Sequence, residues 1–252
     1  MAGTARHAVI TGGGSGVGAA VAASLFDAGF HVTVMGRRME PLADTVARHP
    51  GMKAVSCDVT DATAVAAAFD EARRKQGPVT VMVANAGAAD SAPFHATGED
   101  DLRRMLDVNL VGVFNCWQAA LGDMRTDGWG RLIAVASTAG LKGYPYVSAY
   151  VSAKHAVIGL TRALSLELAR TGVTVNAVCP GFMDTPLLQN SIDKIMEKTG
   201  LSEDAARKQL ASANPQGRFI DVAEVASAVL YLAGDAAGAV NGHALTLSGG
   251  EI

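Results

Sequence analysis

The chain has 252 residues, of which 49% are hydrophobic and 18% are charged, and its formal net charge is −3. This composition is typical of a globular protein with enough apolar mass for a sheet that is buried on both faces. No block of basic residues is present, so we expect neither nucleic acid nor a membrane surface as a partner.

Short apolar runs rich in valine and isoleucine alternate with longer, alanine-rich stretches. The runs predict strands at His7–Ile10, His31–Met35, Lys53–Ser56, Val79–Ala84, Arg131–Ala136, Val173–Val178 and Ala244–Leu247. The stretches between them predict helices, among them Gly16–Asp27, Ala62–Lys75, Leu102–Ala120, Ala149–Arg170 and Val222–Ala233. Such alternation builds βαβ units, with parallel strands and helices on both faces. We therefore expect one α/β domain over residues 1–252, a doubly wound sheet of seven mainly parallel strands.

The first predicted strand and helix fall within a run of 19 uncharged residues, Ala8–Phe26, which is long enough to raise the question of a membrane span. Five glycines between Gly12 and Gly18 favour a turn over a spanning helix. The chain shows no basic segment followed by a small-residue cleavage site, so we expect no secretory signal. We expect a cytoplasmic protein.

The glycine-rich segment Thr11–Gly18 ends the first predicted strand and opens the first predicted helix. Glycines at such a place allow a tight turn and a close approach of the backbone to a pyrophosphate, which lies against free N–H groups at the helix N-terminus. A flexible loop would leave this placement between strand and helix unexplained. The segment therefore predicts a dinucleotide site, with contacts from Gly12, Ser15, Gly16, Val17 and Gly18.

Two arginines follow the second predicted strand, where NAD-binding proteins carry an acid that accepts hydrogen bonds from the ribose hydroxyls. The segment reads Met35-Gly36-Arg37-Arg38, and the next carboxylate is Glu40. A guanidinium there can pair with a 2′-phosphate, and a charge-assisted bond is worth roughly 1.5–3 kcal/mol. We predict a preference for NADP(H), carried by Arg37 with help from Arg38. Arginine also stacks on adenine without discriminating, which leaves NAD(H) open.

Tyr150 and Lys154 are four residues apart in a predicted helix, so their side chains lie on one face. A free tyrosine titrates near pH ~10. A fixed ammonium nearby lowers that pKa toward the working pH, where proton transfer is most effective. Such pairs are common on helix surfaces, and this one gains weight from the motifs around it.

Residues 184–214 form a longer connection than a simple crossover between the sixth and seventh predicted strands. The segment contains helix formers at Ile192–Lys198 and Ser202–Ser212, mixed with apolar residues. We expect a helical lid over a ligand. The alternative is a helical hairpin that only packs or mediates contacts in an oligomer.

Taken in order, these motifs resemble the short-chain dehydrogenase/reductase family over essentially the whole chain. The family's TGxxxGxG turn is matched by Thr11, Gly12, Gly16 and Gly18, and its serine, thirteen residues before the tyrosine, is matched by Ser137. The resemblance implies a Rossmann-like fold. It also implies hydride exchange between a nicotinamide cofactor and a carbonyl or alcohol carbon of a small molecule.

The resemblance further implies a role for each site residue. Tyr150 would donate a proton to the carbonyl oxygen, while Lys154 lowers its pKa and holds the nicotinamide ribose. Ser137 would stabilise the substrate oxygen, and Asn109 would connect Lys154 to a water chain. Further cofactor contacts are implied at Asp58, Val59, Asn85, Ala86, Gly87, Pro180, Gly181, Met183 and Thr185, the last one on the nicotinamide carboxamide.

Two positions depart from the family's pattern. The usual Asn-Asn-Ala-Gly after the fourth strand reads Ala84-Asn85-Ala86-Gly87, which removes one asparagine that would brace this turn. The residue before the catalytic lysine is Ala153, where serine is common. Neither change removes a group that the chemistry needs.

Within the family, the segment from Tyr150 to Phe182 is most similar to ketoreductases of 3-oxoacyl thioesters and aromatic polyketides. It is also similar to 3-hydroxyacyl-CoA dehydrogenases. We expect reduction of a 3-oxoacyl-type or bulky ketone by NADPH. An NAD-dependent dehydrogenase of a secondary alcohol or a 3-hydroxyacyl-CoA is the alternative. A catalytically silent cofactor-sensing protein is a third hypothesis, disfavoured because serine, tyrosine and lysine are all kept.

The remaining expectations concern assembly, cysteines and the pocket. The resemblance implies a homotetramer in which the Ala149–Arg170 helix is a contact surface. The cysteines are far apart and odd in number, so Cys57, Cys116 and Cys179 are expected as buried free thiols in a reducing compartment. The histidines show no ligand pattern, so we predict no catalytic metal. The expected pocket walls are Tyr144, Tyr146, Phe94, Phe182, Met183, Leu187 and Leu188.

Overall fold

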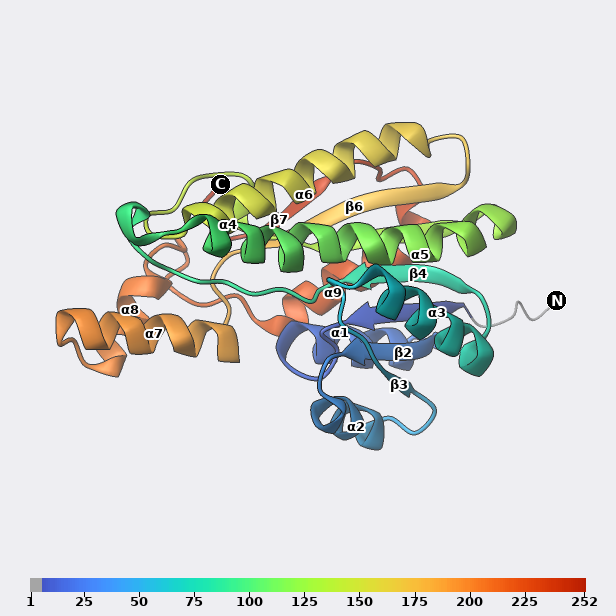
Figure 1. Ribbon diagram of the computed structural model, residues 1–252, viewed down its shortest axis with the longest axis horizontal. Coiled ribbons are helices and arrows are strands. Elements are labelled where there is room, and N and C mark those ends of the chain that lie inside the picture. The colour runs from blue at the N-terminus through green and yellow to red at the C-terminus, as the bar shows by residue number, and fades with distance from the viewer. Residues whose placement is uncertain (1–5) are drawn as a thin grey trace.

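The computed structural model describes residues 6–252, apart from the side chains of Pro186, Leu187 and Asn190. Seven strands form one sheet in the order β3-β2-β1-β4-β5-β6-β7, and all neighbouring strands are parallel (Figure 1). Strand order reverses between β1 and β4, which is where α/β sheets of this kind open a crevice at their carboxyl ends. The strands are β1 (His7–Thr11), β2 (His31–Gly36), β3 (Lys53–Ser56), β4 (Val79–Ala84), β5 (Gly130–Val135), β6 (Val173–Pro180) and β7 (Ala244–Leu247).

Helices cover both faces of the sheet. One face carries α1 (Gly16–Asp27), α2 (Met39–Arg48) and α9 (Val222–Ala233). The other carries α3 (Ala62–Gln76), α4 (Glu99–Leu106), α5 (Gly112–Asp127) and α6 (Ser148–Glu167). The doubly wound, Rossmann-like architecture expected from the sequence is thus the architecture of the protein.

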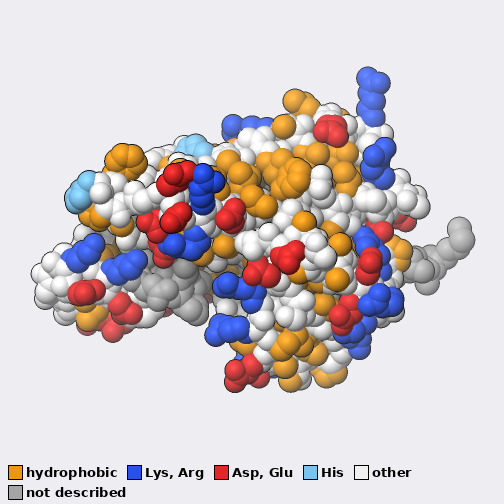
Figure 2. Space-filling view, viewed as in Figure 1, with side chains coloured by type: hydrophobic (Ala, Val, Ile, Leu, Met, Phe, Trp, Pro, Cys, Tyr) orange, Lys and Arg blue, Asp and Glu red, His pale blue; other side chains and the backbone are white. Residues whose placement is uncertain are grey.

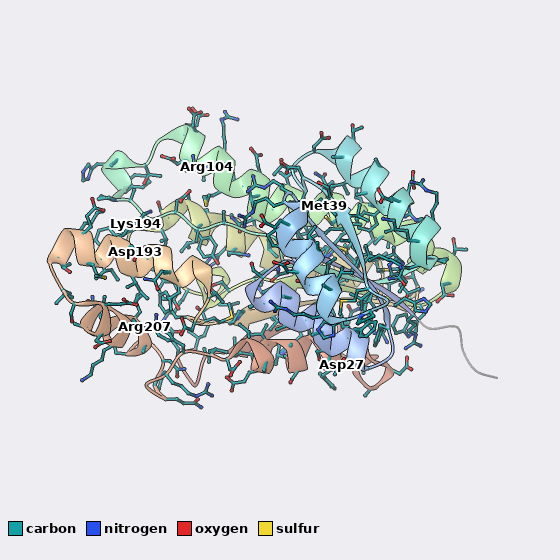
Figure 3. The ribbon with its side chains drawn as sticks, turned by 90° about the horizontal axis from the view of Figure 1, so that it is seen from below. Asp27, Met39, Arg104, Asp193, Lys194 and Arg207 are labelled. Carbon is teal, nitrogen blue, oxygen red and sulfur yellow. The ribbon has the colours of Figure 1, made fainter. Side chains whose placement is uncertain are left out.

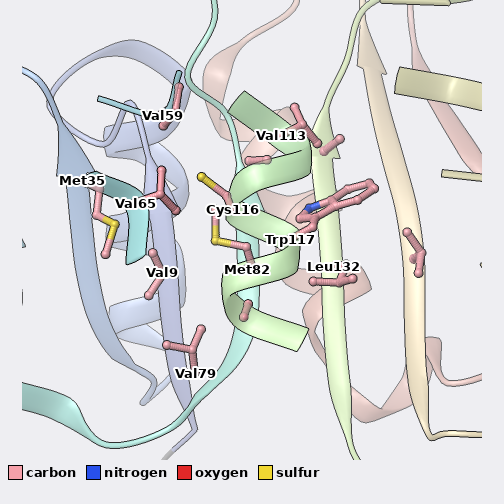
Figure 4. Close-up of a cluster of buried hydrophobic side chains, with 14 of the residues drawn as sticks. Val9, Met35, Val59, Val65, Val79, Met82, Val113, Cys116, Trp117 and Leu132 are labelled. Atoms are coloured by element: carbon pink, nitrogen blue, oxygen red, sulfur yellow. The ribbon is translucent and has the colours of Figure 1, made fainter. Parts of the chain in front are cut away.

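The core under α3, α5 and α6 shows why the central strands are continuously apolar. Val9 of β1 and Leu132 of β5 meet Val65 of α3 and Trp117 of α5 (Figure 4). A second cluster fills the opposite face, so β1, β4 and β5 are buried along their whole length. Burial on both faces selects valine and isoleucine at successive positions, and it holds the carboxyl ends of these strands rigidly.

The predicted strands agree closely with the observed ones, whereas the helix predicted at Leu102–Ala120 is too short at both ends. One helical stretch runs from Glu99 to Asp127, and a π-helical turn at Asp107–Val111 divides it into α4 and α5. It begins after Gly98, whose N–H donates to the side chain of Asp101, and it ends at Gly128 in the left-handed conformation.

The predicted lid contains two helices, α7 (Pro186–Thr199) and α8 (Glu203–Ala211), at the left of Figure 1. The first begins six residues before the predicted Ile192, because proline is well suited to the first helical position. Ile192 and Ala206 are buried where α7 and α8 pack together, in a small cluster separate from the two sheet cores. Between residues 6 and 252, no helix combines the length and apolarity that crossing a bilayer requires.

Candidate active site

A tight glycine turn joins β1 to α1. Gly12 has a φ of +66°, and a Cβ there would lie 2.8 Å from Nδ2 of Asn85. A Cβ at Gly18 would lie 2.2 Å from the carbonyl oxygen of Gly12, so helix and turn touch directly. Ser15, the N-cap of α1, makes no capping bond with its side chain, and the first turn carries no acid. The N-terminal N–H groups of α1 therefore remain available to an anion such as a pyrophosphate.

Asn85 ties the end of β4 to this glycine turn. Its Nδ2 donates to the carbonyl oxygens of Thr11 (2.9 Å) and Gly12 (3.3 Å). The hydroxyl of Thr11 in turn accepts from the backbone N–H groups of Asn85 (3.0 Å) and Ala86 (3.1 Å). The preceding Ala84 is buried within β4. One asparagine therefore braces the turn, and alanine at the other position leaves the bracing intact.

A cavity of about 360 Å³ extends along this edge of the sheet. Arg37 and Arg38, which are exposed, lie on its wall with Asp58. The N–H (3.0 Å) and hydroxyl (2.8 Å) of Thr60 both donate to Asp58 and hold its pKa below the usual value, with a smaller contribution from Arg37. The predicted cofactor residues on its wall are Gly12, Ser15, Val17, Arg37, Arg38, Asp58, Val59, Asn85, Ala86, Gly87, Tyr150, Lys154, Met183 and Thr185.

Some predicted cofactor residues lie elsewhere, and others were missed. Gly16 and Gly18 are absent from the wall of this cavity, although both shape the turn beneath it. Sequence reasoning missed Cys57 and Thr60, which flank the predicted Asp58 and Val59 pair on the wall. The strand ending at Ser56 is the signal that could have indicated them, because residues after a parallel strand meet at the same edge.

Asn109 lies in the π-helical turn between α4 and α5 and is fully buried. Its Nδ2 donates to the carbonyl oxygen of Ala88 (2.9 Å), and its Oδ1 accepts from the N–H of Ala88 (3.3 Å). A Cβ at Gly87 would lie 2.8 Å from Asn109 Oδ1 and 3.8 Å from Lys154 Nζ. The backbone of Gly87 therefore lies between the amide of Asn109 and the ammonium of Lys154.

Ser137 follows β5 and begins a 3-10 turn at Thr138–Gly140. Its hydroxyl accepts from the N–H of Ala139 (3.1 Å), so the serine also caps this turn. A Cβ at Gly140 would lie 2.8 Å from the carbonyl oxygen of Lys154, which leaves no space between the turn and α6. This close packing fixes Ser137 beside the helix that carries Tyr150 and Lys154.

The interactions that shift the pKa of Tyr150 differ from the expectation. Nζ of Lys154 donates to the carbonyl oxygen of Val135 (3.0 Å) and lies 5.6 Å from the centre of the Tyr150 ring. Burial lowers the pKa of Lys154 to about 8. Burial also raises the pKa of Tyr150, and a hydrogen bond with Ser137 opposes this increase. The interaction that favours the phenolate thus comes from the serine hydroxyl, because the ammonium is directed at the backbone of β5.

A second cavity of about 700 Å³ adjoins the first. Tyr150 lines both cavities, together with Ala136, Met183 and Thr185. Ser137 lines the second cavity, with the predicted Pro180 and Gly181, while Asn109 and Lys154 line the first. Tyr150 therefore stands at the junction of the groove beside the glycine turn and a larger cavity under α7.

The walls of this larger cavity agree with the prediction at five positions and disagree at one. Tyr144, Tyr146, Phe182, Met183 and Leu188 all line it. The prediction for Phe94 is wrong: its side chain is 81% exposed and lies outside the wall, because it sits on a 3-10 turn that faces solvent. The side chain of Leu187 is outside the described residues.

Sequence reasoning also missed Glu251, the penultimate residue. Its carboxylate accepts from the hydroxyl of Tyr144 (2.6 Å) and pairs with Nζ of Lys142 (2.8 Å), and its side chain is only 5% exposed. The Tyr144 hydroxyl also lies 2.7 Å from that of Thr138, the neighbour of Ser137. These hydrogen bonds hold the Tyr144 ring in place on the wall of the larger cavity. No local signal could have joined residues that lie 107 positions apart.

Within residues 6–252, no group of three or more His, Cys, Asp or Glu side chains is arranged to hold a metal ion. The donor set at the two cavities instead consists of backbone N–H groups, hydroxyls, side-chain amides, three ammonium groups and two guanidinium groups. Such a set fits a phosphate-bearing cofactor beside a carbonyl or alcohol substrate.

Comparisons with known proteins agree with this geometry. Residues 6–195 match the family model described as short chain dehydrogenase. The chain is 36% identical over 249 residues to a putative ketoacyl reductase of Streptomyces coelicolor, covering 96% of this chain and 95% of the relative. It is 41% identical over 251 residues to the cis-4-hydroxycyclohexanecarboxylate dehydrogenase of Sinomonas cyclohexanicum. This match covers 97% of this chain and 96% of the relative.

A solved structure is similar over the same extent. The crystal structure of a variant of actinorhodin polyketide ketoreductase with NADPH superposes with a TM-score of 0.95 at 34% sequence identity. The superposition covers 98% of this chain and 97% of that one.

Proposed function

Because the chain belongs to the short-chain dehydrogenase family and is an NAD(P)-dependent oxidoreductase of ketone and alcohol groups, we propose that it reduces a 3-oxoacyl-type or bulky ketone with NADPH. The observation that carries the proposal is the position of Tyr150, which lines both the groove for a dinucleotide and the larger chamber. A proton donor at that junction reaches a carbonyl oxygen whose carbon faces the groove.

Each site residue then has a defined task. When bound, the nicotinamide supplies the hydride. Tyr150 gives its proton to the carbonyl oxygen, and Ser137 donates a hydrogen bond to the same oxygen as charge develops there. Lys154 binds the ribose and carries positive charge close to the phenol. Asn109 holds the segment at Gly87 and Ala88, which fixes the floor on which the cofactor lies.

The preference for NADPH is supported by the two arginines at the groove. Arg37 and Arg38 follow β2 on the wall where a ribose 2′-phosphate would lie, and no acid occupies the position that hydroxyl recognition requires. The solved ketoreductase structure that is similar over nearly the whole chain holds NADPH. Exposed arginines give a partly solvated contact, so we expect about tenfold discrimination, most of it from Arg37.

The second candidate function is an NAD-dependent dehydrogenase of secondary alcohols or 3-hydroxyacyl-CoA thioesters. The relative with 41% identity is named for the oxidation of a cyclic hydroxy acid, which favours this direction. The residues at the junction serve either direction, because Tyr150 takes back the proton when the alcohol is oxidised.

Steady-state kinetics tests the cofactor and the direction together. We expect kcat/KM for NADPH to exceed that for NADH at least tenfold with a 3-oxoacyl thioester or a cyclic ketone as substrate. Arg37→Ser should remove most of that difference, whereas Arg48→Ser, at the end of α2, should keep it. A wild-type preference for NADH would overturn the assignment of NADPH.

We also propose a homotetramer in a reducing compartment such as the cytoplasm. Large hydrophobic side chains are exposed on α5 and α6, with Phe114 at 43% and Leu166 at 81%. Figure 2 shows hydrophobic side chains gathered on the face over these two helices. All three cysteines are free and buried, which suits a compartment where thiols stay reduced.

A further inference from the structure

The wall of the larger cavity carries two charged side chains within the described part of the chain, and both are lysines of α7. Lys194 and Lys198 are four residues apart, so they lie on the same face of this helix. Lys194 is half-buried and Lys198 is exposed. Figure 3 shows Lys194 on α7, beside Asp193 and at the same end of the molecule as Arg104 of α4.

Neither lysine forms an ion pair with any residue from 6 to 252. Asp193 and Glu197, the acids next to them in sequence, are exposed to solvent, and neither is paired with a lysine in the described part of α7. Asp193 accepts from the side chain of Gln189 (2.9 Å), and Asp184 pairs with Arg207. Nζ of Lys194 reaches the carbonyl oxygen of Ser91 at 3.5 Å, which is a long and weak hydrogen bond. The ammonium of Lys194 is therefore not held in an ion pair and can contact a ligand in the cavity.

The surroundings of Lys194 make this charge effective. Ile195, Leu188 and Leu210 line the same cavity, so the wall beside the ammonium is largely apolar. Glu251, the acid behind the wall, is already paired with Lys142 and adds no net negative charge. A cation on a largely apolar wall attracts an anion more strongly than it would in open water.

Building on the proposed function, we propose that Lys194, assisted by Lys198, binds an anionic group of the substrate. The preferred substrate is then a ketone that carries a carboxylate at the end away from the carbonyl. The phosphate of a carrier thioester has the same chemistry and is the other source of such an anion. One relative is named for cis-4-hydroxycyclohexanecarboxylate, a compound that carries an alcohol and a carboxylate on one small ring.

Matched substrates test the proposal by turnover. The first pair is 4-oxocyclohexanecarboxylate and its methyl ester, and the second is acetoacetyl-CoA and the neutral N-acetylcysteamine thioester. We expect Lys194→Gln to lower kcat/KM about tenfold for the anionic member through KM, and to leave the neutral member unchanged. Loss in the first pair identifies the carboxylate, and loss in the second pair alone identifies the phosphate. Lys208→Gln, on α8 and away from both cavities, is the matched control.

A binding measurement separates this inference from the proposed reaction. Calorimetry on the NADP⁺-loaded protein compares cyclohexanecarboxylate with cyclohexanecarboxamide. We expect tighter binding of the acid, lost in Lys194→Gln and retained in Lys208→Gln. Acid binding without ketone turnover would refute the proposed reaction alone. Equal losses of affinity for the acid and the amide in Lys194→Gln would show that Lys194 only holds α7 against the backbone of Ser91. That result would overturn the anion site, and so would an unchanged affinity in Lys194→Gln together with no loss of turnover in either substrate pair.

Discussion

Tyr150 combines two properties that seldom coincide, since its phenol touches both cavities while its surroundings oppose ionisation. Burial keeps the phenol protonated at neutral pH, which is the state that a proton donor requires. Ser137 moderates this effect through its hydrogen bond. The residue is therefore prepared for the reduction of a carbonyl rather than for permanent ionisation.

Replacing this phenol should stop the chemistry and spare cofactor binding. We expect Tyr150→Phe to lower kcat by roughly a hundredfold to ten-thousandfold, the usual contribution of a positioned proton donor. The dissociation constant for NADPH, measured by fluorescence titration, should change little. Tyr231→Phe, on the exposed side of α9, serves as the control. Near-normal turnover in Tyr150→Phe would remove the tyrosine from the mechanism.

The pKa of Lys154 predicts a pH profile. Burial lowers this pKa to about 8, so the ammonium is present below about pH 8 and is lost as the pH rises through that value. For the reduction, kcat/KM should therefore be level near pH 7 and fall above pH 8. The arginine of Lys154→Arg keeps its charge to higher pH, so the decrease in kcat/KM should begin at a higher pH than in the wild type. This holds even if the variant has a lower maximal kcat/KM. A wild-type profile that stays level to pH 10 would contradict this assignment.

At the scale of elements, the π-helical turn between α4 and α5 connects the sheet to the site. An α-helix with an inserted residue turns Asn109 out of the regular ladder, and such turns occur frequently at functional sites. Asn109 then holds both polar backbone groups of Ala88, in the loop after β4. The loop, the turn and α6 meet at Gly87, where no side chain fits.

A methyl group at Gly87 should disturb this meeting point. Because Asn109 Oδ1 is held by Ala88 and lies 2.8 Å from the position of the new Cβ, we expect Gly87→Ala to lower kcat/KM about tenfold or more. Gly122→Ala is the matched control, since its Cβ would meet nothing within 4 Å on the exposed side of α5. That control should gain about 0.5–1 kcal/mol of helix stability at unchanged activity. Equal activities of the two variants, measured with the same ketone, would contradict the role of the turn.

At the scale of the whole molecule, the exposed apolar face over α5 and α6 is the surface through which we propose that the tetramer assembles. The face adjoins the helix that carries Tyr150 and Lys154. Association through it would therefore stiffen the catalytic helix from the side opposite the sheet.

Placing a charge on this face should break the assembly. We expect Leu166→Glu to lower the molar mass in size-exclusion chromatography with light scattering from a tetramer to a smaller species, because a buried unpaired carboxylate is costly. Leu201→Glu, in the loop between α7 and α8, is the control and should leave the mass unchanged. A tetramer that persists in Leu166→Glu would place the interface elsewhere, and a monomeric wild type would refute the tetramer.

The amino-acid sequence by itself determined the fold class, the order of the elements and the surroundings of the glycine turn. Strand periodicity, the Gly12 and Gly18 spacing and the Tyr150–Lys154 pair all depend on neighbours along the chain, which local chemistry specifies. Only the tertiary structure decided which face each side chain meets. It joined Glu251 to Tyr144, left Phe94 in solvent and directed Lys154 at β5. These outcomes depend on packing between segments far apart in sequence, and burial there sets the pKa values that no local pattern encodes.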